Sequence, residues 1–161
     1  MRSIALAAML AAAVACAPAV TTTTTVPVAV AVTPVVLPPG AQWGGGPPFL
    51  PAGVRLAVLD GDPGKEGIFT VRLWMPNDYR VPPHTHPAFE HVTIVSGVLH
   101  LGMGNTFTMN GADELRQGAF RAIGPNMPHF VHAAGETVVQ IHGMGPFSIK
   151  YVNAADDPRS R

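Results

Sequence analysis

The chain has 161 residues, which is enough for one domain and hardly enough for two. Only 12% of the residues are charged, against about 25% in typical domains, and ten basic residues balance ten acidic ones. The sequence therefore lacks the basic patch that nucleic-acid binding requires, and no nucleic-acid partner is expected. Gly and Pro occur 17 times each, which favours many turns over long helices and predicts an all-β domain.

Residues 1–16 resemble a secretory signal, because Arg2 is followed by a run of small apolar residues from Ile4 to Ala15. That run is shorter than the roughly 20 residues of a membrane-spanning helix. The single cysteine, Cys16, follows directly, and the stretch resembles a bacterial lipoprotein cleavage box in which this cysteine carries the lipid. Plain secretion through an Ala-x-Ala site is the alternative. Both predict export, to the periplasm or to a membrane through a lipid anchor, without an internal disulfide.

Residues 17–48 form a low-complexity tract rich in Thr, Val and Pro. Prolines interrupt regular structure, so the tract is expected to be an extended linker. A leader without a role and an edge strand over 26–37 are the alternatives. The folded domain is therefore expected over residues 49–161.

Short segments separated by Gly, Pro and Asn predict a series of strands in this domain. They cover residues 54–60, 68–76, 90–97, 98–104, 105–111, 118–124, 129–134, 136–143 and 146–153. One helical turn is expected at 111–118. So many short strands predict a sandwich or a small barrel.

The segment 82–97, PPHTHPAFEHVTIVSG, concentrates imidazole and carboxylate groups in an apolar strand. Side chains two positions apart share one face of a strand, so His84 and His86 project together. Glu90 joins them if the chain stays extended past Pro87. Because unpaired charge in an apolar interior is costly, this pattern indicates a metal site.

This segment and a later one resemble the two sequence motifs of the cupin superfamily. The first motif, His-x-His, three residues, Glu, six residues, Gly, is filled by His84, His86, Glu90 and Gly97. The second begins at Gly118 and reaches His129.

Departures from the two motifs fall at turns. Gly124 and Asn126 replace a proline and a glycine of the second motif, and Asp78 replaces a glycine before the first. Asn tolerates positive φ, so we expect the turn before His129 to be kept.

The resemblance implies a double-stranded β-helix, or jelly roll, and a metal held by His84, His86, Glu90 and His129. One divalent transition metal ion (Fe, Mn, Ni, Cu or Zn) suits such ligands. A metalloenzyme acting on a small oxygen-containing molecule, as an oxygenase, isomerase or lyase, is expected. The alternative is a non-catalytic metal- or ligand-binding or sensor module at the cell envelope. By the same resemblance the chain is expected to form a homodimer.

Other polar and aromatic side chains are candidates for the pocket or for contacts with the ligands, with a core or exposed position as the alternative. They are Gln140, His142, Phe69, Trp74, Tyr79 and Arg80. His91, His100 and His132 lie out of phase with the inward apolar positions and are expected to face away.

Overall fold

The computed structural model describes residues 36–161. The expected signal segment, Cys16 and most of the expected linker lie outside these residues. Within 36–161 no helix has the length and apolar character needed to cross a membrane.

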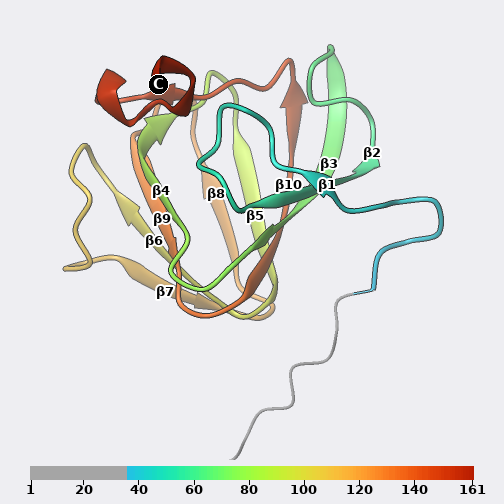
Figure 1. The fold of residues 1–161 in the computed structure, drawn as a ribbon, viewed down its shortest axis with the longest axis horizontal. Helices are drawn as coiled ribbons and strands as arrows, with labels where there is room; N and C mark the ends of the chain where they lie inside the picture. The colour runs from blue at the N-terminus through green and yellow to red at the C-terminus, as the bar shows by residue number, and fades with distance from the viewer. Residues whose placement is uncertain (1–35) are drawn as a thin grey trace, which may run out of the picture. The chain divides into compact units, whose positions relative to one another are not determined.

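Two antiparallel sheets face each other and form a jelly roll, as Figure 1 shows. The first sheet contains, in spatial order, β1 (Gly44–Gly45), β2 (Arg55–Asp60), β3 (Gly67–Met75), β10 (Thr137–Gly145), β5 (Glu90–Ser96) and β8 (Phe120–Ile123). The second contains β11 (Lys150–Tyr151), β4 (Arg80–Thr85), β9 (His129–Ala133), β6 (Val98–Met103) and β7 (Asp113–Arg116). Two short 3₁₀ turns, η1 (Ala154–Asp156) and η2 (Pro158–Ser160), follow.

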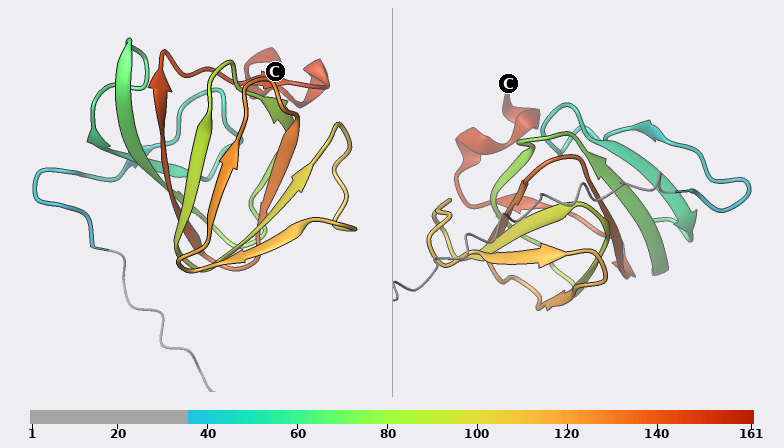
Figure 2. Two further views of the ribbon diagram at one scale, coloured as in Figure 1. Left: turned by 180° about the vertical axis from the view of Figure 1, so that it is seen from behind. Right: turned by 90° about the horizontal axis from the view of Figure 1, so that it is seen from below.

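From β3 to β6 and again from β7 to β11, successive strands alternate between the two sheets. The chain thereby winds around one interior, and Figure 2 shows both layers from two further directions. Residues Phe69, Ile94, Leu99 and Leu101 fill that interior and are almost fully buried. The expected all-β double-stranded β-helix is confirmed.

Three segments differ from the predicted strands. Residues 113–116 form β7 instead of a helical turn, because they pair with β6 and place Leu115 opposite Leu99. The segment 105–111 is loop. Within 146–153 only Lys150–Tyr151 pairs as a strand.

The predicted series of strands omits β4, although the shared face of His84 and His86 assumes a strand there, because consecutive prolines obscure the pattern. Pro82 and Pro83 have no N–H to donate, and the pairing of β4 with β9 shifts register between Val81 and His84. The shift is a β-bulge, which lets Val81 and His84 both face the interior although three positions separate them.

Two of the three departures from the cupin motifs, the two where glycine is replaced, adopt the left-handed conformation that glycine usually supplies. Asn126 has φ 58° and Asp78 has φ 63°. The N–H of Asn126 donates to the carbonyl of His86 at 2.7 Å, which ties the turn before His129 to the end of β4. The expected turn at Asn126 is confirmed.

The first sheet begins before residue 49. Gly44 and Gly45 pair with Leu56 and Arg55 at the edge of that sheet. Part of the tract expected as linker therefore lies on the folded domain.

Candidate metal centre

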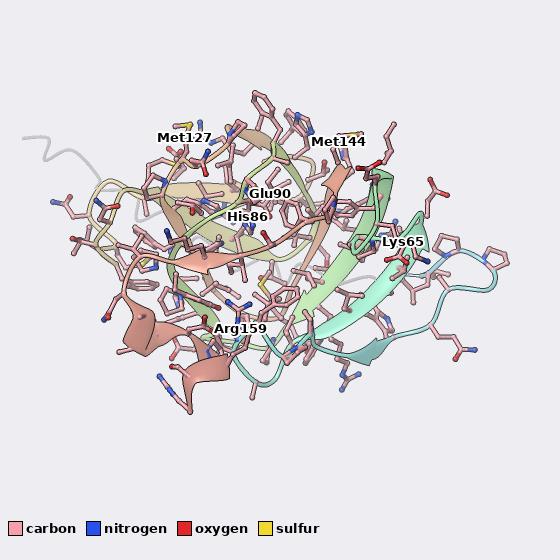
Figure 3. The ribbon with its side chains drawn as sticks, turned by 90° about the horizontal axis from the view of Figure 1, so that it is seen from above. Lys65, His86, Glu90, Met127, Met144 and Arg159 are labelled. Atoms are coloured by element: carbon pink, nitrogen blue, oxygen red, sulfur yellow. The ribbon has the colours of Figure 1, made fainter. Side chains whose placement is uncertain are left out.

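Four side chains from both sheets meet inside the barrel. His84 on β4 and His129 on β9 lie directly opposite each other in their ladder. His86 follows the end of β4, and Glu90 begins β5 in the other sheet. All four are buried, with 1–6% of each residue exposed. Figure 3 shows His86 and Glu90 close together within the barrel.

Glu90 reaches the histidines by a route that strand parity does not describe. The chain leaves β4 at Thr85, turns, and crosses to the opposite sheet before β5 begins at Glu90. Glu90 therefore meets His86 because the two sheets face each other, not because the chain stays extended past Pro87.

The three imidazoles are close enough to share one ion. The His84 ring centroid lies 4.2 Å from that of His129 and 5.0 Å from that of His86, and 5.2 Å separates His86 from His129. One nitrogen from each ring lies within 4.8 Å of the others. Glu90 Oε2 is 3.1 Å from His129 Nε2 and 3.5 Å from His86 Nε2.

Backbone carbonyls fix the orientation of each ring. The Nδ1 atoms of His84, His86 and His129 lie 2.7, 2.8 and 3.0 Å from the carbonyl oxygens of Pro82, Ser148 and Met127. A carbonyl accepts a hydrogen bond from a protonated Nδ1. The Nε2 atom of the same neutral ring then carries no hydrogen, and its lone pair is free to bind a metal. Within the described residues His86 Nε2 is buried without a hydrogen-bond partner. These residues therefore fit a metal ion.

The electrostatic environment keeps two of the imidazoles neutral. Burial, followed by the neighbouring His129 and His86, lowers the pKa of His84 to about 3. Burial also lowers the pKa of His86. Burial by itself would raise the pKa of Glu90, but the imidazoles around it, first of all His129 with its Nε2 atom 3.1 Å from the carboxylate, outweigh burial and lower that pKa. Neutral imidazole and ionised carboxylate are the forms that bind metals.

The four side chains lie in the wall of an apolar cavity of about 100 Å³ that opens to solvent. Tyr79 is the one other residue in its wall with a polar side chain, among residues 36–161. Its hydroxyl donates to the carbonyl of Pro51 at 2.6 Å. The remaining lining side chains are apolar, including Phe69, Val71, Val92, Leu101, Ile141 and Phe147.

Of the other candidate pocket residues, Phe69 and Tyr79 line the cavity and the rest do not. On β3 and β10 the lining positions alternate with positions on the outer face of the sheet. Trp74 and Gln140 lie at outer positions, where Trp74 Nε1 donates to Glu136 at 2.6 Å and Gln140 accepts from Arg72 at 3.3 Å.

His142 and Arg80 also lie away from the cavity. The His142 ring stacks on His91, 4.7 Å between centroids. Arg80 pairs with Asp78 at 2.8 Å near the start of β4. Arg80 therefore does not offer its guanidinium to a substrate in the cavity.

Several groups at the site were not predicted from the sequence. Phe147 stacks on the His86 ring with centroids 4.3 Å apart, and Ser148 orients that ring through its backbone carbonyl. Pro47, Phe49 and Leu50 close one side of the cavity. A backbone carbonyl leaves no residue-type signal, and the segment around Pro47 resembled linker.

Comparisons with known proteins find similarity in structure only. No protein-family model matches the chain, and no curated protein matches its sequence. An RmlC-like cupin from Shewanella frigidimarina superposes with a TM-score of 0.53 at 11% identity. The match covers 65% of this chain and 84% of that cupin. A cupin 2 domain-containing protein from Halorhodospira halophila superposes with a TM-score of 0.54 at 17% identity. The match covers 65% of this chain and 73% of that protein.

An enzyme is also among the similar structures. The DMSP lyase DddQ from Ruegeria pomeroyi has a TM-score of 0.55 at 19% identity, and the match covers 69% of this chain and 60% of the lyase. At these identities the likeness establishes the fold. The chain has the cupin fold, with a buried cluster of three histidines that could bind a metal ion.

Proposed function

We propose that this protein is a metal-dependent enzyme acting on a small, largely apolar molecule that carries an oxygen donor. The observation that supports the proposal is the convergence of His84, His86, His129 and Glu90 in the wall of an apolar cavity. The three Nε2 atoms and one carboxylate oxygen would hold the ion. A bound divalent metal would supply open coordination positions for an oxygen donor and act on it as a Lewis acid.

The cavity wall restricts the substrate. Except for the four metal-binding side chains and Tyr79, the wall residues in the described part of the chain offer no polar side chain. A sugar or a multiply charged acid would bury polar groups without partners, which is unfavourable. The cavity of about 100 Å³ is smaller than the roughly 150 Å³ engineered cavity that holds benzene, which favours a compact molecule. We infer a short carbonyl or enol compound.

Metal analysis of variants tests the ion site. His86→Ala and His129→Ala should lose the bound metal and any turnover together, and Glu90→Gln should weaken binding because the neutral amide replaces the carboxylate. His91→Ala is the matched control, because His91 is adjacent to Glu90 but stacks on His142 outside the cavity. Metal content that is unchanged in His86→Ala would refute the site.

A substrate screen with the metal-loaded protein tests the chemistry. Small carbonyl and enol compounds should turn over, whereas phenols and sugars should not, and His86→Ala should be inactive. Turnover by metal-stripped protein would contradict a metal-dependent mechanism.

The alternative function is a non-catalytic ligand-binding module. The hydrogen bond from the Tyr79 hydroxyl to the Pro51 carbonyl favours this alternative, because the hydroxyl is then not free to act on a substrate. Saturable binding of small carbonyl and enol compounds without turnover would establish it.

We also propose that the protein is exported and, through Cys16, lipid-anchored. The support is the sequence of residues 1–16. Metabolic labelling with a radioactive fatty acid should label the wild type and not Cys16→Ala. An unlabelled wild type in the periplasmic fraction would indicate simple secretion, and retention in the cytoplasm would refute export.

A further inference from the structure

Four titratable side chains form a row across the second sheet, outside the cavity. In the order β4, β9, β6, β7, they are Asp78 just before β4, His132 on β9, His100 on β6 and Glu114 on β7. His132 lies directly opposite His100, and His100 directly opposite Glu114. This outer row therefore has a carboxylate at each end and two imidazoles in the middle.

Each imidazole turns its Nε2 atom toward a carboxylate. His132 Nε2 is 2.8 Å from Asp78 Oδ1, and His100 Nε2 is 3.5 Å from Glu114 Oε2. A carboxylate beside one ring nitrogen holds the proton there and leaves the other nitrogen as a lone-pair donor. The hydrogen bonds from Arg80 and then His132 lower the pKa of Asp78, so the acceptor at that end is ionised at neutral pH.

The second nitrogen of each ring has no partner. Nδ1 of His100 and Nδ1 of His132 are both buried and unpaired within the described residues. His86 Nε2, at the candidate metal centre, is likewise buried and has no hydrogen-bond partner within these residues. In all three rings a protein oxygen faces one nitrogen while the other is free, and a buried lone pair without a partner is destabilising.

The distance between the two rings suits a shared ion. Their centroids are 5.6 Å apart, with 58° between the ring planes. Metal–nitrogen bonds of about 2.0–2.1 Å place two imidazoles bound to one ion with centroids roughly 5–6.5 Å apart, from tetrahedral to linear angles. The observed separation lies inside that interval.

We propose that His100 and His132 form a second metal site, which binds a divalent transition ion through their Nδ1 atoms on the outer face of the second sheet. Asp78 and Glu114 orient the two rings, and water completes the coordination. Zn²⁺, Cu²⁺ and Ni²⁺ are the ions that imidazole suits. The two histidine side chains are 23% and 16% exposed on the outer face, whereas their Nδ1 atoms are buried, so the ion enters from solvent with a small rotation of the rings and not through the cavity.

The charges around the outer row make this site weaker than the interior one. Arg80 pairs with Asp78 at 2.8 Å, and Arg116 pairs with Glu114 at 2.6 Å. Each carboxylate is thus balanced by an arginine. Neither carboxylate is placed as a ligand, whereas Glu90 is at the interior site. We therefore expect the second ion to dissociate first during dialysis.

Zinc stoichiometry tests the site. Equilibrium dialysis followed by elemental analysis should give two Zn²⁺ per wild-type chain and one in both His100→Ala and His132→Ala. His142→Ala is the matched control, because His142 and His91 are also a cross-strand imidazole pair, but their rings stack on each other and His91 also stacks on Phe89 and Phe120. This control should bind two ions. Two ions in both His100→Ala and His132→Ala would overturn the proposal.

A second measurement uses the unaltered protein. In NMR spectra, the ring signals of His100 and His132 should shift together as the second equivalent of Zn²⁺ is added. Signals that respond to pH but not to Zn²⁺ would show a shared proton in place of a metal, and would refute the site. The interior centre is tested separately, because its ion is lost in His86→Ala, and the outer one should remain in that variant.

Discussion

At the residue scale, the partner of each ring nitrogen distinguishes the histidines. His84, His86 and His129 have Nδ1 beside a backbone carbonyl and point Nε2 into the cluster. His91 and His142 instead stack on neighbouring rings. The residue type is the same, but the hydrogen-bond acceptor decides which nitrogen is free to bind an ion.

Gly102 is a position where a single methyl group should disturb the core. Gly102 lies directly opposite Phe130, and a Cβ at residue 102 would collide with the Phe130 ring. Phe130 is 1% exposed and also packs against Phe107, so it has little room to move. We expect Gly102→Ala to lower the free energy of unfolding by about 1–3 kcal/mol in urea denaturation.

A double-mutant cycle measures how much of the loss of stability in Gly102→Ala comes from the collision with the Phe130 ring. In a Phe130→Leu background the alanine should destabilise less, because the smaller side chain leaves space. Gly45→Ala is the control, since a Cβ there meets nothing within 4 Å. If Gly102→Ala is as stable as Gly45→Ala, the packing account of Gly102 is wrong.

At the element scale, the bulge in β4 brings the ligands to the correct face. In a regular strand, Val81 and His84 would point to opposite faces because three positions separate them. The register shift between them turns both inward, and His86 follows two positions later. The Pro82 carbonyl at this bulge also accepts the hydrogen bond from His84.

Residues 47–51, which we call the strap, lie along one side of the cavity. The protein's two tyrosines both donate hydrogen bonds to the strap. Tyr79 donates its hydroxyl to the carbonyl of Pro51 at 2.6 Å, and Tyr151 donates to that of Phe49 at 2.8 Å. Replacing both with Phe should cost about 0.5–1.5 kcal/mol per bond and increase hydrogen exchange at Phe49 and Leu50, since the other strap residues are prolines without an N–H.

The control for the strap is Trp74→Phe, which removes a hydrogen bond to Glu136 on the outer face of the first sheet. It should leave exchange in residues 47–51 unchanged. Equal exchange in the wild type and the Tyr79→Phe/Tyr151→Phe variant would show that packing of Phe49 and Leu50 alone holds the strap.

At the scale of the whole molecule, the buried site should make the metal-free protein sensitive to acid. The pKa of His84 falls from 6.5 in the unfolded chain to about 3 in the folded protein, and that of His86 is also lowered. Below pH 6.5 the unfolded chain therefore binds more protons. The free energy of unfolding should fall by about 1.4 kcal/mol per pH unit for each such histidine.

Urea denaturation of chelator-treated protein at pH 7, 6 and 5 measures this dependence. Stability is complete above pH 6.5 and decreases as the pH falls toward about 3. The lowered pKa of Glu90 acts in the same direction below 4.5. His84→Gln should flatten the curve, because it removes one titrating group. Equal stability at pH 7 and pH 5 would contradict the burial of neutral imidazole.

The all-β class and the residues of the central cluster could be predicted from local sequence patterns. Frequent Gly and Pro and short apolar runs act locally, so they predict strands without knowledge of the fold. The motif spacing named His84, His86, Glu90 and His129, and the structure brings these four together.

Which strands are neighbours could not be predicted from the sequence and depends on long-range pairing in the fold. The tertiary structure placed Glu90 in the sheet opposite His86, made 113–116 a strand by pairing it with β6, and put Gln140 and His142 on an outer face. It also aligned His100 with His132 between two carboxylates. The physical reason is that alternation along a strand separates its two faces, whereas pairing between distant segments decides which face is interior.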